Sequence, residues 1–157
     1  MRIRIYYEDT DCGGILYHTN YIKYCERARS ELFFSRGLLP SQASAGFVVS
    51  AMEAKFLGFA RLGDMLEVRS KLTKLGKVQI VLLQDIYKLS HLSVLDSSAN
   101  ILESAQKSTQ KKQLRSSEEK IFSAQVRLGY VDVVSQKPVA IPKHLEQVFL
   151  ELGNDIH

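Results

Sequence analysis

The stretch TNYIKYCERARSELFFSRG, residues 19–37, decides the fold predicted for this chain. Thr19 and Asn20 are both N-cap residue types, and Gly37 fits the position just past a helix C-terminus. Between them, apolar side chains recur at i, i+3, i+4, i+7 and i+11, on one face of a 3.6-residue repeat: Tyr21, Tyr24, Cys25, Ala28 and Leu32. The spacing predicts an amphipathic helix of about five turns, half buried against a sheet.

Alternating apolar and polar residues predict strands on both sides of this helix. Alternation covers residues 2–8, 47–57, 64–75 and 122–130, whereas residues 77–89 are nearly continuously apolar, as a central strand would be. Turn residues at Gly63-Asp64 and Leu75-Gly76-Lys77 indicate that successive strands pair as antiparallel neighbours. A short closing helix is indicated after Pro142 by the spacing of Leu145, Val148, Phe149 and Leu152. This order is typical of an α+β fold in which an antiparallel sheet packs on a helix, and its uncovered edges favour self-association.

Residues 90–117 differ from the rest of the chain. They are rich in serine, show weak periodicity and carry a basic cluster of Lys107, Lys111, Lys112 and Arg115. We interpret this segment as a long loop inserted between two strands. The cluster is either a solvated face of that loop or a docking surface for an acidic partner or a phosphate-bearing ligand. With the insertion included, residues 1–157 are expected to form a single domain.

Composition excludes several classes of protein. With 45% hydrophobic and 24% charged residues, the chain is neither collagen-like nor disordered. The net charge of +4 is mostly spread along the sequence, which argues against nucleic-acid binding. No apolar run approaches the ~20 residues of a membrane span, and the N-terminus has no signal-peptide stretch. With only two cysteines, Cys12 and Cys25, these features predict a cytoplasmic protein without a transmembrane segment.

Polar groups crowd into the residues just before the predicted helix. They are Tyr7, Glu8, Asp9, Asp11 and His18, and Gly13 and Gly14 let the backbone turn tightly among them. A helix N-terminus offers unpaired N–H groups and a positive dipole end, which can polarise a carbonyl and hold a developing oxyanion. A carboxylate beside these donors could act as nucleophile or as general base for water. The combination predicts acyl transfer or hydrolysis at a carbonyl.

Each residue also has an alternative interpretation. Asp9 or Asp11 could be a turn or capping residue, and His18 a structural histidine. Cys12 could be a thiolate nucleophile with His18 as its base, although no third orienting group stands at a recognisable spacing. A metal site of Asp9, Asp11 and His18 departs from the calcium-loop pattern, because Gly13 stands at the third ligand position. No glycine-rich nucleotide motif is present, so nucleotide hydrolysis and nicotinamide chemistry have no support.

The residues around Asp11 resemble the active-site motif of the hotdog-fold thioesterases of the 4-hydroxybenzoyl-CoA thioesterase family. The positions that carry the resemblance are Arg4-Ile5, Thr10-Asp11, Gly14-Ile15 and Tyr17-His18. A longer run resembles the YbgC type of small acyl-CoA thioesterases associated with the bacterial Tol-Pal system. That run continues through Asn20-Tyr21, Lys23-Tyr24 and Glu26-Arg27-Ala28-Arg29, with Pro138, Ile141-Pro142 and Lys143 later in the chain. The resemblance covers residues 2–90 and 119–150.

The resemblance implies roles for individual residues. Asp11 corresponds to the catalytic carboxylate, which attacks the thioester carbonyl of an acyl-CoA or activates the water that does. His18 corresponds to a residue that positions this carboxylate or the substrate, and the N–H near His18 would polarise the thioester carbonyl. Tyr7 matches a position that lines the site and supports catalysis. Gly14 and Tyr17 are the substrate-positioning candidates.

The resemblance also implies an assembly. The sheet is expected to wrap around the helix of residues 20–36, and two copies are expected to pair their sheets in a homodimer with active sites at the interface. Such dimers often pair into homotetramers. Neither a metal nor an organic cofactor is implied, because coenzyme A belongs to the substrate.

The sequence departs from the family pattern at two places, and it also leaves two other functions open. Leu16 stands where the family prefers a smaller residue, and the insertion at 90–117 is larger than expected. A hotdog hydratase or dehydratase would use a similar acid–base pair, and a non-catalytic partner of acyl carrier protein or of the envelope machinery would use the basic cluster. Neither the motif nor the strand pattern specifies the acyl chain length or whether the acyl group is aromatic or aliphatic.

Overall fold

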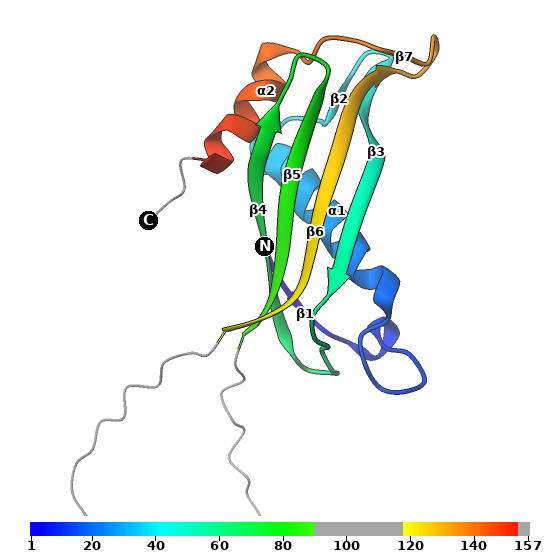
Figure 1. The fold of residues 1–157 in the computed structure, drawn as a ribbon, viewed down its shortest axis with the longest axis vertical. Coiled ribbons are helices and arrows are strands. Elements are labelled where there is room, and N and C mark those ends of the chain that lie inside the picture. Colours follow the sequence, from blue (N-terminus) through cyan, green and yellow to red (C-terminus); the bar gives the residue numbers. More distant parts are fainter. Residues whose placement is uncertain (90–117, 154–157) are drawn as a thin grey trace, which may run out of the picture.

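The computed structural model describes residues 1–89 and 118–153, so the predicted insertion at 90–117 lies outside the described residues. The elements, in chain order, are β1 (Arg2–Arg4), a 3-10 turn (Tyr7–Asp9), α1 (His18–Phe34), β2 (Ser41–Gln42), β3 (Ala45–Phe56), β4 (Met65–Leu75), β5 (Gln79–Leu89), β6 (Glu118–Asp132), β7 (Lys137–Pro138), α2 (Lys143–Leu150) and a final 3-10 turn (Glu151–Gly153). The predicted α+β class is confirmed (Figure 1).

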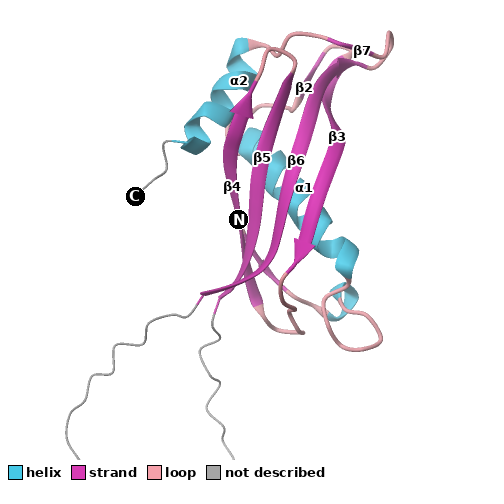
Figure 2. Cartoon of the chain, in the orientation of Figure 1, coloured by secondary structure: helices cyan, strands magenta, loops and turns pink. Residues whose placement is uncertain are grey.

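The strands form a single antiparallel sheet within the described residues. Its order is β1-β4-β5-β6-β3-β2, and the short β7 pairs with β6. Helix α1 runs across one face of this sheet, and α2 lies at the end of the molecule near β4 and β5 (Figure 2). The four long strands are β3 to β6. Within the described residues, β3 pairs with β6 on one side, and on its other side the two-residue β2 pairs only with its first two residues. Strand β3 is therefore an edge strand over most of its length.

The core lies between α1 and the sheet, as the periodicity predicts. Tyr21, Tyr24, Cys25 and Ala28 are buried on the helix. Opposite them, inward-facing residues of β4, β5 and β6 such as Leu66, Ile80, Leu82, Ile86, Phe122 and Val126 are fully buried. A second aromatic cluster, formed by Phe33, Phe47, Tyr130 and Phe149, joins the C-terminal end of α1 to α2. Helix α2 therefore covers the end of the core that α1 does not reach.

A polar cluster interrupts this apolar interface. The guanidinium of Arg29 donates to the side-chain oxygen of Gln84 at 2.6 Å, and both side chains are buried. The Gln84 amide in turn donates to the carbonyl of Cys25 at 3.0 Å and to the hydroxyl of Ser70 at 2.9 Å. Burial lowers the pKa of Arg29. Gln84 thus ties the middle of α1 to strands β4 and β5.

Two predicted boundaries are wrong. The strand expected over residues 2–8 ends at Arg4, because the Asp9 carboxylate accepts the N–H of Tyr6 at 2.9 Å and supports a 3-10 turn there. The helix begins at His18, with Tyr17 as its N-cap, rather than after Thr19 or Asn20. Asn20 is not its N-cap because its side chain donates to the carbonyl of Asp9 at 2.9 Å instead.

One predicted connection is also wrong. Leu75-Gly76-Lys77 joins the paired strands β4 and β5, as expected, but Gly63-Asp64 does not join neighbours. Strand β3 pairs with β6, and β4 pairs with β1 and β5. Residues 57–64 therefore cross the end of the sheet from one side to the other, and Gly63 makes its turn within that crossing with φ of 87°.

Candidate active site

Residues 10–16 form a tight loop at the end of the sheet where α1 begins. The N–H of Asp11 donates to the carbonyl of Ile15 at 2.9 Å, and the N–H of Gly14 donates to the carbonyl of Asp11 at 3.0 Å. Gly14 has a φ of 74°, a left-handed conformation that glycine adopts without strain. Gly14 therefore shapes the loop that carries Asp11, and its role in positioning a substrate stays a prediction.

The loop holds the Asp11 carboxylate in place. Its Oδ1 atom accepts the N–H of Gly13 at 2.8 Å and the N–H of Ile15 at 3.4 Å. The side chain is partly exposed, and Oδ2 accepts no hydrogen bond from any residue in 1–89 or 118–153. One carboxylate oxygen thus orients the group, while the other is available to take a proton or attack a carbonyl carbon.

The N-terminus of α1 presents unpaired donors next to this loop. Tyr17 is the N-cap, in an extended conformation, and its side chain makes no capping hydrogen bond. The N–H groups of His18 and Thr19 belong to the first turn and have no acceptor among the described residues. Together with the positive end of the helix dipole, they can stabilise the oxyanion that forms when a thioester carbonyl is attacked.

Asp9 joins the loop to the helix. Its carbonyl accepts the N–H of Tyr17 at 2.9 Å as well as the Asn20 side chain, and its buried carboxylate accepts the N–H of Tyr6. The pKa of Tyr24 is raised, first by burial and then by the nearby Asp9 carboxylate. The two aspartates left open by the sequence therefore differ: Asp9 is a buried structural anchor, and Asp11 faces outward.

The three aromatic candidates lie at the surface. The rings of Tyr17 and His18 meet edge to face with centroids 4.5 Å apart, and both residues are exposed. Tyr7 is 82% exposed on the 3-10 turn. No hydrogen bond joins Asp11, His18 and Tyr7 through their side chains within the described part of the chain. The structure brings Asp11, Gly14, Tyr17 and His18 together through the loop backbone, whereas Tyr7 lies in the preceding turn.

Sequence reasoning missed the segment that holds this loop from the other side. The N–H of Leu16 donates to the carbonyl of Ala60 at 2.9 Å, and Ile15 forms an antiparallel bridge with Arg61. Both partners belong to the crossing segment 57–64. The misassigned turn at Gly63 hid this contact, because a hairpin there would have kept residues 57–64 away from the N-terminal loop.

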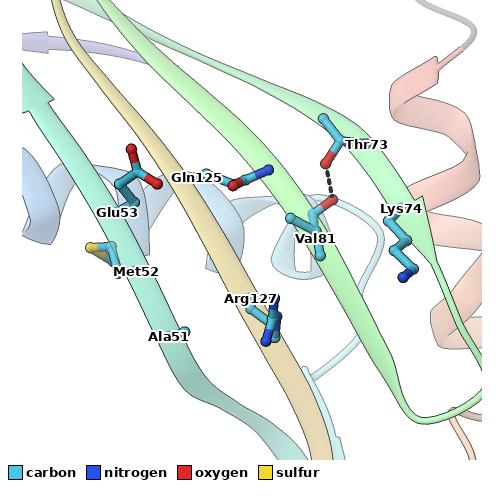
Figure 3. A pocket seen from close by; sticks show the side chains of 8 residues that line it. All are labelled: Ala51, Met52, Glu53, Thr73, Lys74, Val81, Gln125 and Arg127. Carbon is cyan, nitrogen blue, oxygen red and sulfur yellow. Dashed lines mark hydrogen bonds between the residues drawn. The ribbon is translucent and has the colours of Figure 1, made fainter.

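The geometry does not support the two alternatives to Asp11, a cysteine nucleophile and a metal site. Cys12 is exposed and Cys25 is buried, with burial raising the pKa of the Cys25 thiol to about 12. No three His, Cys, Asp or Glu side chains converge as a metal site in residues 1–89 and 118–153. A hollow of about 410 Å³ lies among exposed residues of the sheet, including Glu53, Lys74 and Arg127 (Figure 3), but contains none of the predicted site residues.

Comparison with known proteins supplies the family. The thioesterase superfamily matches residues 13–94, which include part of the Asp11 loop, α1 and strands β2 to β5. The chain belongs to the thioesterase superfamily. It is 40% identical to the acyl-CoA thioesterase YbgC of Helicobacter pylori over 156 residues, covering 99% of this chain and 100% of that protein. It is 32% identical to the acyl-CoA thioester hydrolase YbgC of Escherichia coli O157:H7, covering 94% of this chain and 92% of that protein.

Solved structures of the thioesterase superfamily share the fold, and the hotdog prediction is confirmed. A probable thioesterase from Bartonella henselae matches with a TM-score of 0.65 at 21% identity, covering 90% of this chain and 97% of that one. A hypothetical protein from Aquifex aeolicus matches with a TM-score of 0.69 at 22% identity, covering 95% and 97%. The described residues of this superfamily member contain no helix long and apolar enough to cross a membrane.

Proposed function

We propose that the chain hydrolyses the thioester of an acyl-CoA to a free carboxylic acid and coenzyme A, with Asp11 as the catalytic carboxylate. One observation carries the proposal: the partly exposed carboxylate of Asp11 is fixed on a tight loop beside the unpaired N–H groups at the start of α1. A carboxylate and an oxyanion-stabilising donor pair are the two groups that thioester hydrolysis needs. The identity to two acyl-CoA thioesterases over nearly the whole chain supports the same substrate class.

The thioester carbonyl would accept hydrogen bonds from the N–H groups of His18 and Thr19. As a general base, Asp11 takes a proton from water, the hydroxide oxygen bonds to the carbonyl carbon, and the carbon–sulfur bond breaks. The CoA thiolate then takes up the proton. As a nucleophile, Asp11 bonds to the carbonyl carbon itself, CoA leaves, and water hydrolyses the resulting anhydride. The His18 imidazole and Tyr17 ring flank the substrate in either route, and Tyr7 is a supporting residue at the rim.

The test uses the full chain and a panel of acyl-CoAs that differ in chain length and aromaticity. We expect release of free CoA thiol together with an equal amount of carboxylic acid. A 2-enoyl-CoA distinguishes a thioesterase from a hotdog hydratase, because a hydratase would add water across the double bond and leave the thioester intact. Failure to hydrolyse any acyl-CoA, combined with retained binding to acyl carrier protein, would favour a non-catalytic partner instead.

We also propose that two copies pair through the free edge of β3. Among the described residues, most of this strand has no neighbour on its outer side, and it presents Val48, Val49 and Phe56 with 40%, 50% and 51% of their surfaces exposed. An edge strand with exposed apolar side chains is a ready template for pairing with a second strand. A tetramer would require a second contact, for which the open face of the sheet is available.

Replacing Val49 by glutamate is expected to convert the dimer into monomers. The change places a charge at the paired edge, which opposes association of two apolar strands. Sedimentation should show the wild-type chain at twice the 17.8 kDa of one chain and the variant at 17.8 kDa. Leu150→Glu is the matched control, because Leu150 is 40% exposed on α2 and lies off this edge. A wild-type chain that sediments as a monomer would contradict the proposal.

Two further proposals concern the cellular location of the protein and its protein partners. We propose a cytoplasmic protein, which is supported by two cysteines that are both free thiols. An association with the Tol-Pal system and binding of acyl carrier protein rest on the resemblance to the YbgC type. Co-purification of these components with the full chain, compared with a chain in which the Lys107, Lys111, Lys112 and Arg115 cluster is neutralised, tests both.

A further inference from the structure

We propose that Arg61 and Lys88, held over the ring of Phe59, bind the phosphate groups of the CoA portion of the substrate. This inference rests on the proposed function, because it assigns a second part of the same substrate. Phe59 belongs to the segment that crosses the end of the sheet, and it is 50% exposed. The guanidinium carbon of Arg61 lies 5.1 Å from its ring centroid, and the Lys88 ammonium lies 5.9 Å from it.

The position of this group ties it to the reacting centre. Arg61 bridges to Ile15, whose N–H contacts the Asp11 carboxylate, and Ala60 accepts the N–H of Leu16. Gly58 anchors the segment on its other side by donating to the carbonyl of Ile121 at 3.0 Å. The crossing segment therefore borders the Asp11 loop, and we place along it the pantetheine arm that links the thioester of CoA to its phosphates.

The charges fit an anionic ligand. Arg61 is exposed, and its guanidinium has no carboxylate within ion-pair distance among the described residues. Lys88 pairs with Glu119 at 2.7 Å and donates to the carbonyl of Phe59 at 3.4 Å, so its ammonium is held at the crossing segment and would share its charge between Glu119 and a phosphate. An aromatic face attracts cations and limits their motion, so the two charges are held ready for a phosphate.

The contrast with the basic side chains on the open sheet face supports this choice. Lys74 and Arg127 line the hollow of Figure 3, and within residues 1–89 and 118–153 neither side chain forms a hydrogen bond to the Asp11 loop or to the crossing segment. Lys120 pairs with Asp85, and Arg69 pairs with Glu67 and Glu118. Lys88 is paired as well, with Glu119, but it also donates to the carbonyl of Phe59 in the crossing segment. Among the described cations, Arg61 combines an unpaired charge with a backbone contact to the catalytic loop.

The experiment compares two thioesters of the same acyl group, one with CoA and one with N-acetylcysteamine, which lacks the phosphates. Arg61→Gln and Lys88→Gln are each expected to raise KM for the acyl-CoA about fivefold, because each exposed cation–phosphate contact contributes modestly and in binding alone. The kcat for both thioesters and the KM for the truncated one should stay within about twofold. Lys74→Gln is the matched control, and none of its constants should change.

The outcomes separate this inference from the proposed function. Equal losses on both thioesters in the Arg61 and Lys88 variants would show that these residues support the loop rather than the phosphates, and would overturn the inference. No change on either thioester would overturn it as well. A loss confined to acyl groups carried by acyl carrier protein would assign the surface to an acidic protein partner and contradict the phosphate assignment. A wild-type chain inactive on both thioesters would instead be a failure of the proposed function.

Discussion

Asp11→Asn is expected to lower kcat for acyl-CoA hydrolysis by about 10² to 10⁴, the range that a positioned general base or nucleophile contributes. Asparagine keeps the side-chain oxygen that accepts the N–H groups of Gly13 and Ile15, so the loop should retain its shape. It loses the charge that would take a proton from water or attack the carbonyl. The fall should therefore appear in kcat, measured by release of CoA thiol, with little change in KM.

Two neighbouring residues serve as controls for this variant. Glu8→Gln removes an exposed carboxylate three residues away, and Cys12→Ser removes the exposed thiol next to Asp11. Both should keep activity within about threefold, which corresponds to ~0.65 kcal/mol in the barrier. If Asp11→Asn stays within that range, Asp11 is not the catalyst. If Cys12→Ser loses activity instead, the thiol is the nucleophile.

Gln84→Leu should reduce the free energy of unfolding by about 3 kcal/mol. The variant removes the hydrogen bond to the buried guanidinium of Arg29 and also the donors to Cys25 and Ser70. A buried charge without its partner is costly, because the lost hydration is no longer compensated. For a chain of this size, the midpoint of thermal unfolding should fall by roughly 6–12 °C. All comparisons need one protein concentration, since the proposed dimerisation would shift the midpoint.

A double variant isolates the contribution of this pair. Arg29→Met combined with Gln84→Leu replaces both partners by apolar groups, so the double variant should be more stable than Gln84→Leu alone. Gln125→Leu, at an exposed glutamine of β6, should change stability by less than about 0.5 kcal/mol. If the changes in the free energy of unfolding caused by Arg29→Met and Gln84→Leu simply add in the double variant, Arg29 and Gln84 contribute to stability independently of each other.

The local elements of this fold could be predicted from the sequence because each carries its own periodicity. The apolar stripe from Tyr21 to Leu32 predicts α1, and alternation predicts β3 to β6 within a few residues at each end. The order of the strands could not be predicted in the same way. Pairing of β3 with β6 depends on which edges remain free after β4 and β5 form a hairpin, and a local pattern contains no such information.

In the candidate site, too, the local sequence predicts some features, whereas others depend on the folded structure. The crowding of polar residues before the helix identifies the region, but it does not separate Asp9 from Asp11, because only burial distinguishes an anchor from an exposed carboxylate. Arg29 and Gln84 were not singled out at all. A signal existed for Arg29: it stands four residues after Cys25 and four before Phe33, both buried, so a charge falls on the apolar side of the helix.

The crossing segment 57–64 also has a kinetic consequence. It contacts the N-terminal part of the chain across a long stretch of sequence: Arg4 of β1 donates to the carbonyl of Gly63, 59 residues away, and in the Asp11 loop Leu16 donates to the carbonyl of Ala60. Contacts of such separation close a large loop before they gain any energy, so they form slowly. The helix and the β4–β5 hairpin can form from nearby residues, whereas the Asp11 loop has to wait for both. During synthesis or refolding, activity should therefore appear later than helix content.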